Sequence, residues 1–243
     1  MSTIFRTAIP AALISSLGFI VGTPSLAHAD DTITLGAAVS ITGKYSTNGK
    51  NTKDGYDLAI KVINDKGGVK VAGKTYKLAV KYYDDESTPA RGAQLVERLI
   101  SQDGIKLVLG PYSSGLTKAI APITEKYKIP MVQANGADRE LFTVGYKYMF
   151  AVLSTSDQYI ADAIQLLGEV TEAAKKDPKA LKVAIAIEND PFSQDVRDGV
   201  IADAKKWGMK VVIDDKLPPD FSDMSATLTK VKALKPEIGR AHV

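Results

Sequence analysis

The chain has 243 residues, of which 45% are hydrophobic and 24% are charged, and its formal net charge at pH 7 is +3. This length and apolar content suffice for more than one packed domain. Because acidic and basic residues are interspersed, the small net charge gives no reason to expect nucleic acid or an anionic membrane as a partner. The chain contains no cysteine, which excludes disulfides and thiolate chemistry.

The first 29 residues have the features of a secretory signal peptide. Arg6 gives a positive start, an apolar run covers residues 8–21, and Ala27-His28-Ala29 is a small-x-small cleavage site. An uncleaved membrane anchor is the alternative, but the run is short for a membrane span. We therefore predict cleavage before Asp30 and a periplasmic location.

Histidine is scarce, and its positions exclude common catalytic systems. The two histidines are His28, in the signal peptide, and His242, in the last residues of the chain. Ser-His nucleophiles and the usual zinc sites are therefore not expected, and we predict neither a metal nor a cofactor. Asp84-Asp85-Glu86 is a cluster of acids at a strand end, where solvation or helix capping is the ordinary role. An exported carboxylate-dependent hydrolase would need a second acid facing Asp84 or Asp138, so we predict that the chain is not an enzyme.

Strand and helix patterns alternate along the first half of the chain. Gly67-Gly68 ends the first expected helix, and the second expected helix begins with Thr88 as its cap and Pro89 in its first turn. This alternation predicts α/β architecture with a parallel sheet flanked by helices. Expected strands cover residues 32–39, 76–82, 106–109 and 130–133, and expected helices have apolar faces within residues 56–63, 93–100 and 116–127.

The pattern restarts in the second half, after a charged stretch over residues 172–182. We predict a first lobe over residues 30–150 and a second lobe over 151–236. The second contains only two strand-helix units, so it is expected to be incomplete. Expected strands cover residues 146–152, 183–187 and 210–213, and expected helices cover 156–167 (capped by Ser156-Asp157), 193–207 and 221–234.

Three loops follow parallel strands of the first lobe and should converge on one cleft, since ligands of such sheets bind at the carboxyl ends of strands. They cover residues 42–49, 110–115 and 133–138. The second loop opens a helix, whose free amides and positive dipole end suit an anion. Ser113 and Ser114 are therefore predicted to hydrogen-bond a ligand carboxylate. Ordinary capping is the other interpretation, and both roles are compatible.

Other residues of these loops are candidates with equally ordinary alternatives. Asp138 offers a carboxylate to a ligand ammonium, or is part of a plain turn. Tyr45, Tyr112 and Phe192 are expected to wall the pocket or to belong to the core. A phosphate-binding loop is excluded, because Leu116 occupies the position of its lysine.

Several short motifs, taken in order, resemble one family. The chain is similar to periplasmic solute-binding proteins of the leucine/isoleucine/valine-binding kind. This resemblance implies a two-lobed type I periplasmic-binding-protein fold that closes on a ligand and delivers it to an inner-membrane ABC permease. It also implies a monomer. The motifs are Gly43 and Gly49 in the first loop, residues 64–68 (Asn-Asp-Lys-Gly-Gly), Tyr83-Asp84-Asp85, residues 110–114, and Ile129-Pro130.

The resemblance also implies ligand contacts. The family's carboxylate-binding serine corresponds to Ser114, and its backbone contact after the next strand lies near Asn135. A second-lobe aromatic corresponds to Phe192. Two positions depart from the family, since Ala137 stands where a threonine helps to hold the ligand and Asn48 stands where a tyrosine is found. The predicted ligand is accordingly a small carboxylate or an amino acid.

The last seven residues, Glu237 to Val243, match the translation of a common sequencing adapter. We therefore expect this tail to be an artefact and the family's second lobe to be truncated. A ligand-sensing ectodomain or regulator of the same fold is the alternative to an importer component.

Overall fold

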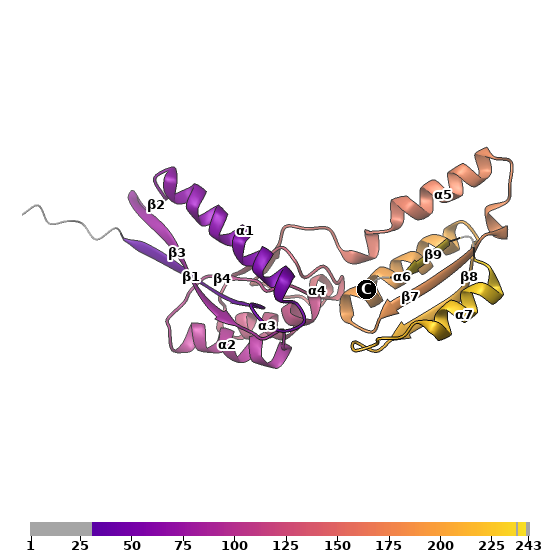
Figure 1. The fold of residues 1–243 in the computed structure, drawn as a ribbon. Coiled ribbons are helices and arrows are strands. Elements are labelled where there is room, and N and C mark those ends of the chain that lie inside the picture. Colours follow the sequence, from indigo (N-terminus) through magenta and orange to yellow (C-terminus); the bar gives the residue numbers. More distant parts are fainter. Residues whose placement is uncertain (1–30, 237, 242–243) are drawn as a thin grey trace, which may run out of the picture. The chain divides into compact units, whose positions relative to one another are not determined.

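The computed structural model describes residues 31–236 and 238–241, so the predicted signal peptide lies outside the described residues. Helices and strands alternate along the chain, and the strands form a six-stranded and a three-stranded sheet, on which a first and a second lobe are built (Figure 1). The elements of the first lobe are β1 (Thr32–Val39), α1 (Ser46–Asp65), β2 (Val69–Val71), β3 (Lys74–Asp84), α2 (Pro89–Ser101), β4 (Val108–Leu109), α3 (Ser114–Tyr127), β5 (Met131–Gln133), α4 (Glu140–Thr143) and β6 (Met149–Ala151).

The first sheet has the order β2-β3-β1-β4-β5-β6. Five neighbouring strands of this sheet, β3, β1, β4, β5 and β6, pair in parallel, as the alternation of strand and helix patterns predicts. The prediction is wrong at β2, which pairs antiparallel with β3 and was not expected as a strand. A two-residue turn joins this hairpin, with positive φ at Ala72 (48°) and Gly73 (82°). Such turns match the twist of paired strands, so this turn is the feature of the sequence from which β2 could have been predicted.

The order of strands reverses at β1. The chain leaves β1 through α1 to reach β3 on one side, and returns through α2 to reach β4 on the other side. Loops that follow β1 and β4 therefore diverge from a common point at the carboxyl ends of the strands. Such a switch point opens a crevice in parallel sheets.

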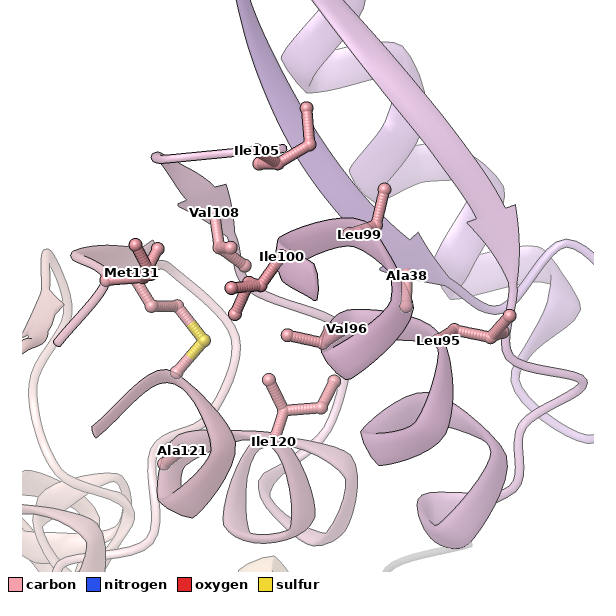
Figure 2. Packing of buried hydrophobic residues seen from close by; sticks show 11 residues of the cluster. Ala38, Leu95, Val96, Leu99, Ile100, Ile105, Val108, Ile120, Ala121 and Met131 are labelled. Carbon is pink, nitrogen blue, oxygen red and sulfur yellow. The ribbon is translucent and has the colours of Figure 1, made fainter. Parts of the chain in front are cut away.

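The core of the first lobe lies between this sheet and helices α2 and α3. Figure 2 shows Val96 and Ile100 of α2 and Ile120 of α3 meeting near Val108 and Met131 of the sheet. The apolar face predicted for α2 is thus confirmed for Val96 and Ile100, which are at most 6% exposed. Burial of such side chains contributes about 1.5–3 kcal/mol each.

The second lobe is built on the parallel sheet β8-β7-β9, in which β7 is central and has Val183 to Ile187 buried. The apolar cluster beside β7 includes Ile164 and Val200, and Trp207 packs against it. The remaining elements are η1 (Ser156–Gln158), α5 (Ala161–Ala173), η2 (Pro178–Ala180), β7 (Lys182–Glu188), α6 (Pro191–Lys206), β8 (Lys210–Leu217), α7 (Ser225–Leu234) and β9 (Ile238–Ala241).

Some predicted helix starts are wrong. Ser156 begins the one-turn helix η1 and does not cap α5, whose N-cap is Ile160. The reason is tertiary, because the Ser156 hydroxyl is bonded to the Ala137 carbonyl (3.1 Å) and to Asp195 (2.6 Å). Helix α1 starts at Ser46, inside the predicted first loop. Among the described residues, no helix is long and apolar enough to cross a bilayer.

Candidate functional site

A cleft of about 440 Å³ lies where loops of the first lobe meet loops of the second. Six of the nine predicted site residues line it, namely Tyr45, Asn48, Tyr112, Ser113, Asn135 and Phe192. The switch point between β1 and β4 supplies the first four, as the topology leads one to expect. Seven lining residues were not predicted: Lys44, Ala134, Leu153, Tyr159, Glu188, Asp190 and Ser193.

Asp84, at the end of β3, holds the loop that follows β1. Its carboxylate accepts hydrogen bonds from the amides of Ile41 (2.9 Å) and Thr42 (3.2 Å) and from the Thr42 hydroxyl (2.7 Å). Partial burial raises the pKa of Asp84, but a hydrogen bond from the Glu86 amide (2.9 Å), together with those from Thr42 and Ile41, keeps this pKa below its ordinary value. The loop is therefore fixed just before Lys44 and Tyr45, which enter the cleft.

Asp85 supports the same loop from a fully buried position. It accepts hydrogen bonds from the Ser40 hydroxyl (2.6 Å) and the Ser87 amide (2.8 Å). Its second oxygen has no partner in the described part of the chain, and burial raises the pKa of this carboxyl. Ser87 in turn accepts a hydrogen bond from the Tyr45 amide (2.9 Å), which links the buried acid to the cleft wall.

Two helices of the first lobe begin at the cleft, with N-caps Tyr45 for α1 and Ser113 for α3. Ser113 has φ 77° and ψ 148°, a conformation that is essentially restricted to glycine, and its hydroxyl accepts the Leu116 amide (3.2 Å). Neither helix has an acidic residue in its first turn. Because amides of a first turn have no acceptor within their helix, both ends favour a bound anion.

Four aromatic rings line the cleft as two pairs. Tyr45 and Tyr112 of the first lobe have ring centroids 5.6 Å apart at 60°, and Tyr159 and Phe192 of the second lobe have centroids 5.7 Å apart at 69°. Burial raises the pKa of Tyr45 and of Tyr159, so both remain neutral phenols at physiological pH. The aromatic prediction is thus consistent with wall positions for Tyr45, Tyr112 and Phe192.

The second lobe contributes two acids at the carboxyl end of β7, Glu188 as the last residue of the strand and Asp190 two residues beyond it. Glu188 pairs with Lys44 of the first lobe, and Asp190 caps α6 by accepting the amides of Phe192 (2.9 Å) and Ser193 (3.2 Å). Burial of Lys44 acts against its charge, but bonding to Glu188 outweighs it and raises the lysine pKa. The rule that ligands gather at strand ends, applied to β7 as well, would have found both acids.

The other three predicted site residues, Ser114, Ala137 and Asp138, do not line the cleft. Ser114 is fully buried, and its hydroxyl accepts the amides of Ala137 and Asp138, each at 3.1 Å. Asp138 pairs with Lys118 (2.5 Å) and accepts the amide of Glu140 (2.8 Å) at the start of α4. These side chains therefore hold the loop after β5, which carries Asn135 into the cleft. Across the described residues, no group of three or more acids is arranged to hold a metal ion.

Comparison with known proteins connects this geometry to one family. A model of the family described as "Periplasmic binding protein" matches residues 32–241. Leu/Ile/Val-binding protein homolog 3 of Brucella melitensis is 28% identical over 93% of this chain and 58% of its own length. An amino acid binding protein of Pseudomonas aeruginosa is 27% identical over 97% of this chain and 59% of its own. The chain thus spans less than two thirds of the length of these relatives.

Solved structures confirm the predicted fold, that of two-lobed type I periplasmic binding proteins. A solute-binding protein from R. palustris in complex with 4-hydroxybenzoate has a TM-score of 0.72 at 24% identity, over 88% of this chain and 54% of that one. The substrate-binding protein LivJ of Streptococcus pneumoniae in complex with isoleucine has a TM-score of 0.70 at 22% identity, over 87% of this chain and 57% of that one.

Proposed function

Because the chain belongs to the periplasmic binding protein family, we propose that it is the solute-binding component of an ABC importer and captures a small carboxylate or an amino acid. Proteins of this family bind solutes, so the prediction that the chain is not an enzyme is confirmed. The observation that carries the proposal is the cleft of about 440 Å³ that both lobes line at the switch point of the first sheet.

The carboxylate of the ligand is proposed to bind where α1 and α3 begin. Amides in the first turns of both helices are oriented toward the N-terminal ends, and neither turn contains an acid. The strained backbone of Ser113 fixes the start of α3 at this position. A carboxylate can therefore be held by amides and helix dipoles without a basic side chain.

Contacts between the lobes supply the means of closure. Lys44 of the first lobe pairs with Glu188 and donates to the Pro219 carbonyl (3.1 Å), and both acceptors belong to the second lobe. A ligand that touches both walls stabilises the closed arrangement in which these bonds form. We propose that the closed protein acts in the periplasm as a monomer and delivers its ligand to an inner-membrane ABC permease.

Because the second lobe of this chain is expected to be truncated, so that the chain as it stands should bind little or no ligand, isothermal titration calorimetry of the full-length protein against a panel of small carboxylates and amino acids tests the proposal. We expect at least one member to bind. Substitution Asn48→Asp introduces a negative charge into the first turn of α1, at the cleft, and should weaken binding of a carboxylate about tenfold. Asn51→Asp, further along the same helix and outside the cleft lining, is the matched control and should leave binding unchanged. A panel without any binder would refute the proposed function.

A further inference from the structure

Both asparagines that line the cleft are followed by glycine. Asn48-Gly49 lies near the start of α1, and Asn135-Gly136 lies in the loop after β5. No other asparagine of the chain precedes a glycine. Because glycine carries no side chain that hinders approach to its nitrogen, an asparagine before it is the kind most prone to lose its side-chain amide.

Deamidation of Asn135 would be an intramolecular acyl transfer. The Gly136 nitrogen gives up its proton and bonds to Cγ of Asn135, the bond between Cγ and Nδ2 breaks, and ammonia leaves. Water then opens the cyclic imide to aspartate or isoaspartate. The Gly136 nitrogen must therefore be released from its hydrogen bond and must come close to Cγ before the reaction can begin.

In the folded protein, Gln133 holds this nitrogen. The Gln133 side chain is buried, and its Oε1 accepts the amides of Asn135 (3.0 Å) and Gly136 (2.6 Å). Its Nε2 donates to the Gly136 carbonyl (2.9 Å). Packing restrains the loop as well, since a Cβ added at Gly136 would lie 2.5 Å from Oγ1 of the buried Thr117. The Gly136 nitrogen cannot attack without breaking its bond to Gln133.

The other Asn-Gly pair is held by backbone alone. The Gly49 amide donates to the Tyr45 carbonyl (2.7 Å) as part of the first turn of α1. No side-chain substitution removes this bond, whereas one substitution at Gln133 removes the acceptor of the Gly136 amide. Asn48 is thus an internal control for Asn135 in the same molecule.

We infer that Asn135 is a deamidation site in the wall of the cleft and that Gln133 controls its rate. The reaction replaces a neutral amide by a carboxylate at a residue that lines the cleft. That charge would oppose a ligand carboxylate. This loss of capture rests on the proposed function, whereas the reaction itself does not.

Peptide mapping by mass spectrometry measures the reaction without any ligand. The full-length protein is incubated at pH 8, and the mass gain of an amide converted to an acid is followed in each peptide. Trypsin separates the two asparagines, because it releases residues 45–50 and residues 129–139 as different peptides.

Substitution of Gln133 is the decisive variant. In Gln133→Leu we expect Asn135 to react about tenfold faster than in the unaltered protein, because the buried acceptor is lost and the loop opens more often. Asn48 should change less than about twofold, since its helix is untouched. Gln102→Leu, at the exposed end of α2, is the matched control and should change neither rate.

Two results would overturn the inference. An unchanged rate at Asn135 in Gln133→Leu would show that Gln133 does not protect it, and equal acceleration of Asn48 and Asn135 would show a general loss of stability. If this variant fails to fold, the unaltered protein decides, since Asn135 should react at least about tenfold faster in urea than in the folded state. Equal rates in the two states would refute protection.

The mass measurement and the ligand titrations fail independently. Because no ligand takes part in deamidation, a refuted role for Gln133 leaves solute binding standing. A ligand panel without a binder, in turn, leaves the reaction at Asn135 standing and removes only its effect on capture.

Discussion

The two walls of the cleft are held in different ways. In the first lobe, Asp84 ends β3 and Asp85 follows it, and both hold the loop after the adjacent strand β1, so the contacts stay within one sheet. In the second lobe, Asp195 lies within α6 and accepts the amides of Arg139 and Asp157, each at 3.0 Å. The contacts of the first wall therefore join adjacent strands of one sheet, whereas those of the second join a helix to the segments at Arg139 and Asp157; in both lobes the partners lie dozens of residues apart in the sequence.

A close approach of backbones accompanies each arrangement. A Cβ added at Gly49 of α1 would lie 2.0 Å from the Ser40 carbonyl oxygen, and one added at Gly199 of α6 would lie 1.9 Å from the Asp157 carbonyl oxygen. In both lobes, then, a glycine lets a wall helix pack directly on the segment that its neighbouring carboxylates hold. These distances imply that neither helix tolerates a side chain at its glycine, Gly49 in α1 or Gly199 in α6.

Alanine at these glycines should have the largest effect. We expect Gly49→Ala and Gly199→Ala each to lower the free energy of unfolding by about 3 kcal/mol, because backbone atoms must move to accept the methyl group. Urea denaturation followed by circular dichroism measures the change. Gly55→Ala is the control in α1, since nothing lies within 4 Å of its added Cβ, and it should raise stability by about 1 kcal/mol. Equal effects at all three positions would remove the packing argument.

Removal of the Asp195 carboxylate in the second lobe should have the second-largest effect on stability. Asp195 is only 6% exposed, and its Oδ2 also accepts the Ser156 hydroxyl at 2.6 Å. Asp195→Ala leaves these donors without their acceptor and should cost about 2 kcal/mol. Asp198→Ala, on the same helix but exposed, should cost less than about 0.5 kcal/mol. If the two variants were equally stable, α6 would not depend on its contact with the crossing segment.

Ser114→Ala distinguishes a structural from a ligand-binding role for that hydroxyl. Its removal leaves the amides of Ala137 and Asp138 without an acceptor and should cost about 1 kcal/mol in the absence of any ligand. Thermal denaturation of the free protein measures this loss. The control Ser101→Ala, at the exposed end of α2, should change stability little. An unchanged free protein with impaired binding would restore the role that the sequence predicted.

The smallest effect concerns the two adjacent acids of the first wall, and it depends on pH. The folded-state pKa of Asp84 is lowered, so its stabilisation is present above the unfolded pKa and is lost as the pH falls through the folded value. The pKa of Asp85 is raised, so its ionisation costs stability as the pH rises from the unfolded toward the folded value. Asp84→Asn should therefore cost about 1 kcal/mol at pH 7, and Asp85→Asn should cost less.

Urea denaturation of both variants and the unaltered protein between pH 3 and pH 7 gives the measurement. The difference for Asp84→Asn should shrink toward pH 3. If the difference in unfolding free energy from the unaltered protein did not change with pH for either variant, hydrogen bonds to the neutral acids would stabilise the loop as well as those to the carboxylates do.

Much of the fold follows from the sequence because local signals agree with tertiary ones. The alternation at β1 and β3 and the Thr88-Pro89 start of α2 predict these elements correctly. The failure at Ser156 has a different origin, since its hydroxyl is bonded to Ala137 and Asp195, distant residues that no local pattern indicates.

The site was predictable only as far as strand ends identify it. Tyr45, Tyr112 and Asn135, which lie in the predicted post-strand loops, line the cleft. Whether Ser114 or its neighbour Ser113 lines the cleft depends on the direction in which each side chain leaves the start of α3, and this is fixed by the Ser113 backbone. Ligand contact by these residues stays a prediction until binding is measured.

Trp207, the sole tryptophan of the chain, has a practical consequence for such measurements. It packs on the apolar cluster of the second lobe, and its ring lies where a Cβ of Gly168 would fall, at 2.3 Å. Its emission is therefore an optical reporter of the second lobe alone, while far-ultraviolet dichroism averages over all helices. Comparing the two signals during denaturation would reveal whether the lobes melt together or in sequence, without any label being attached.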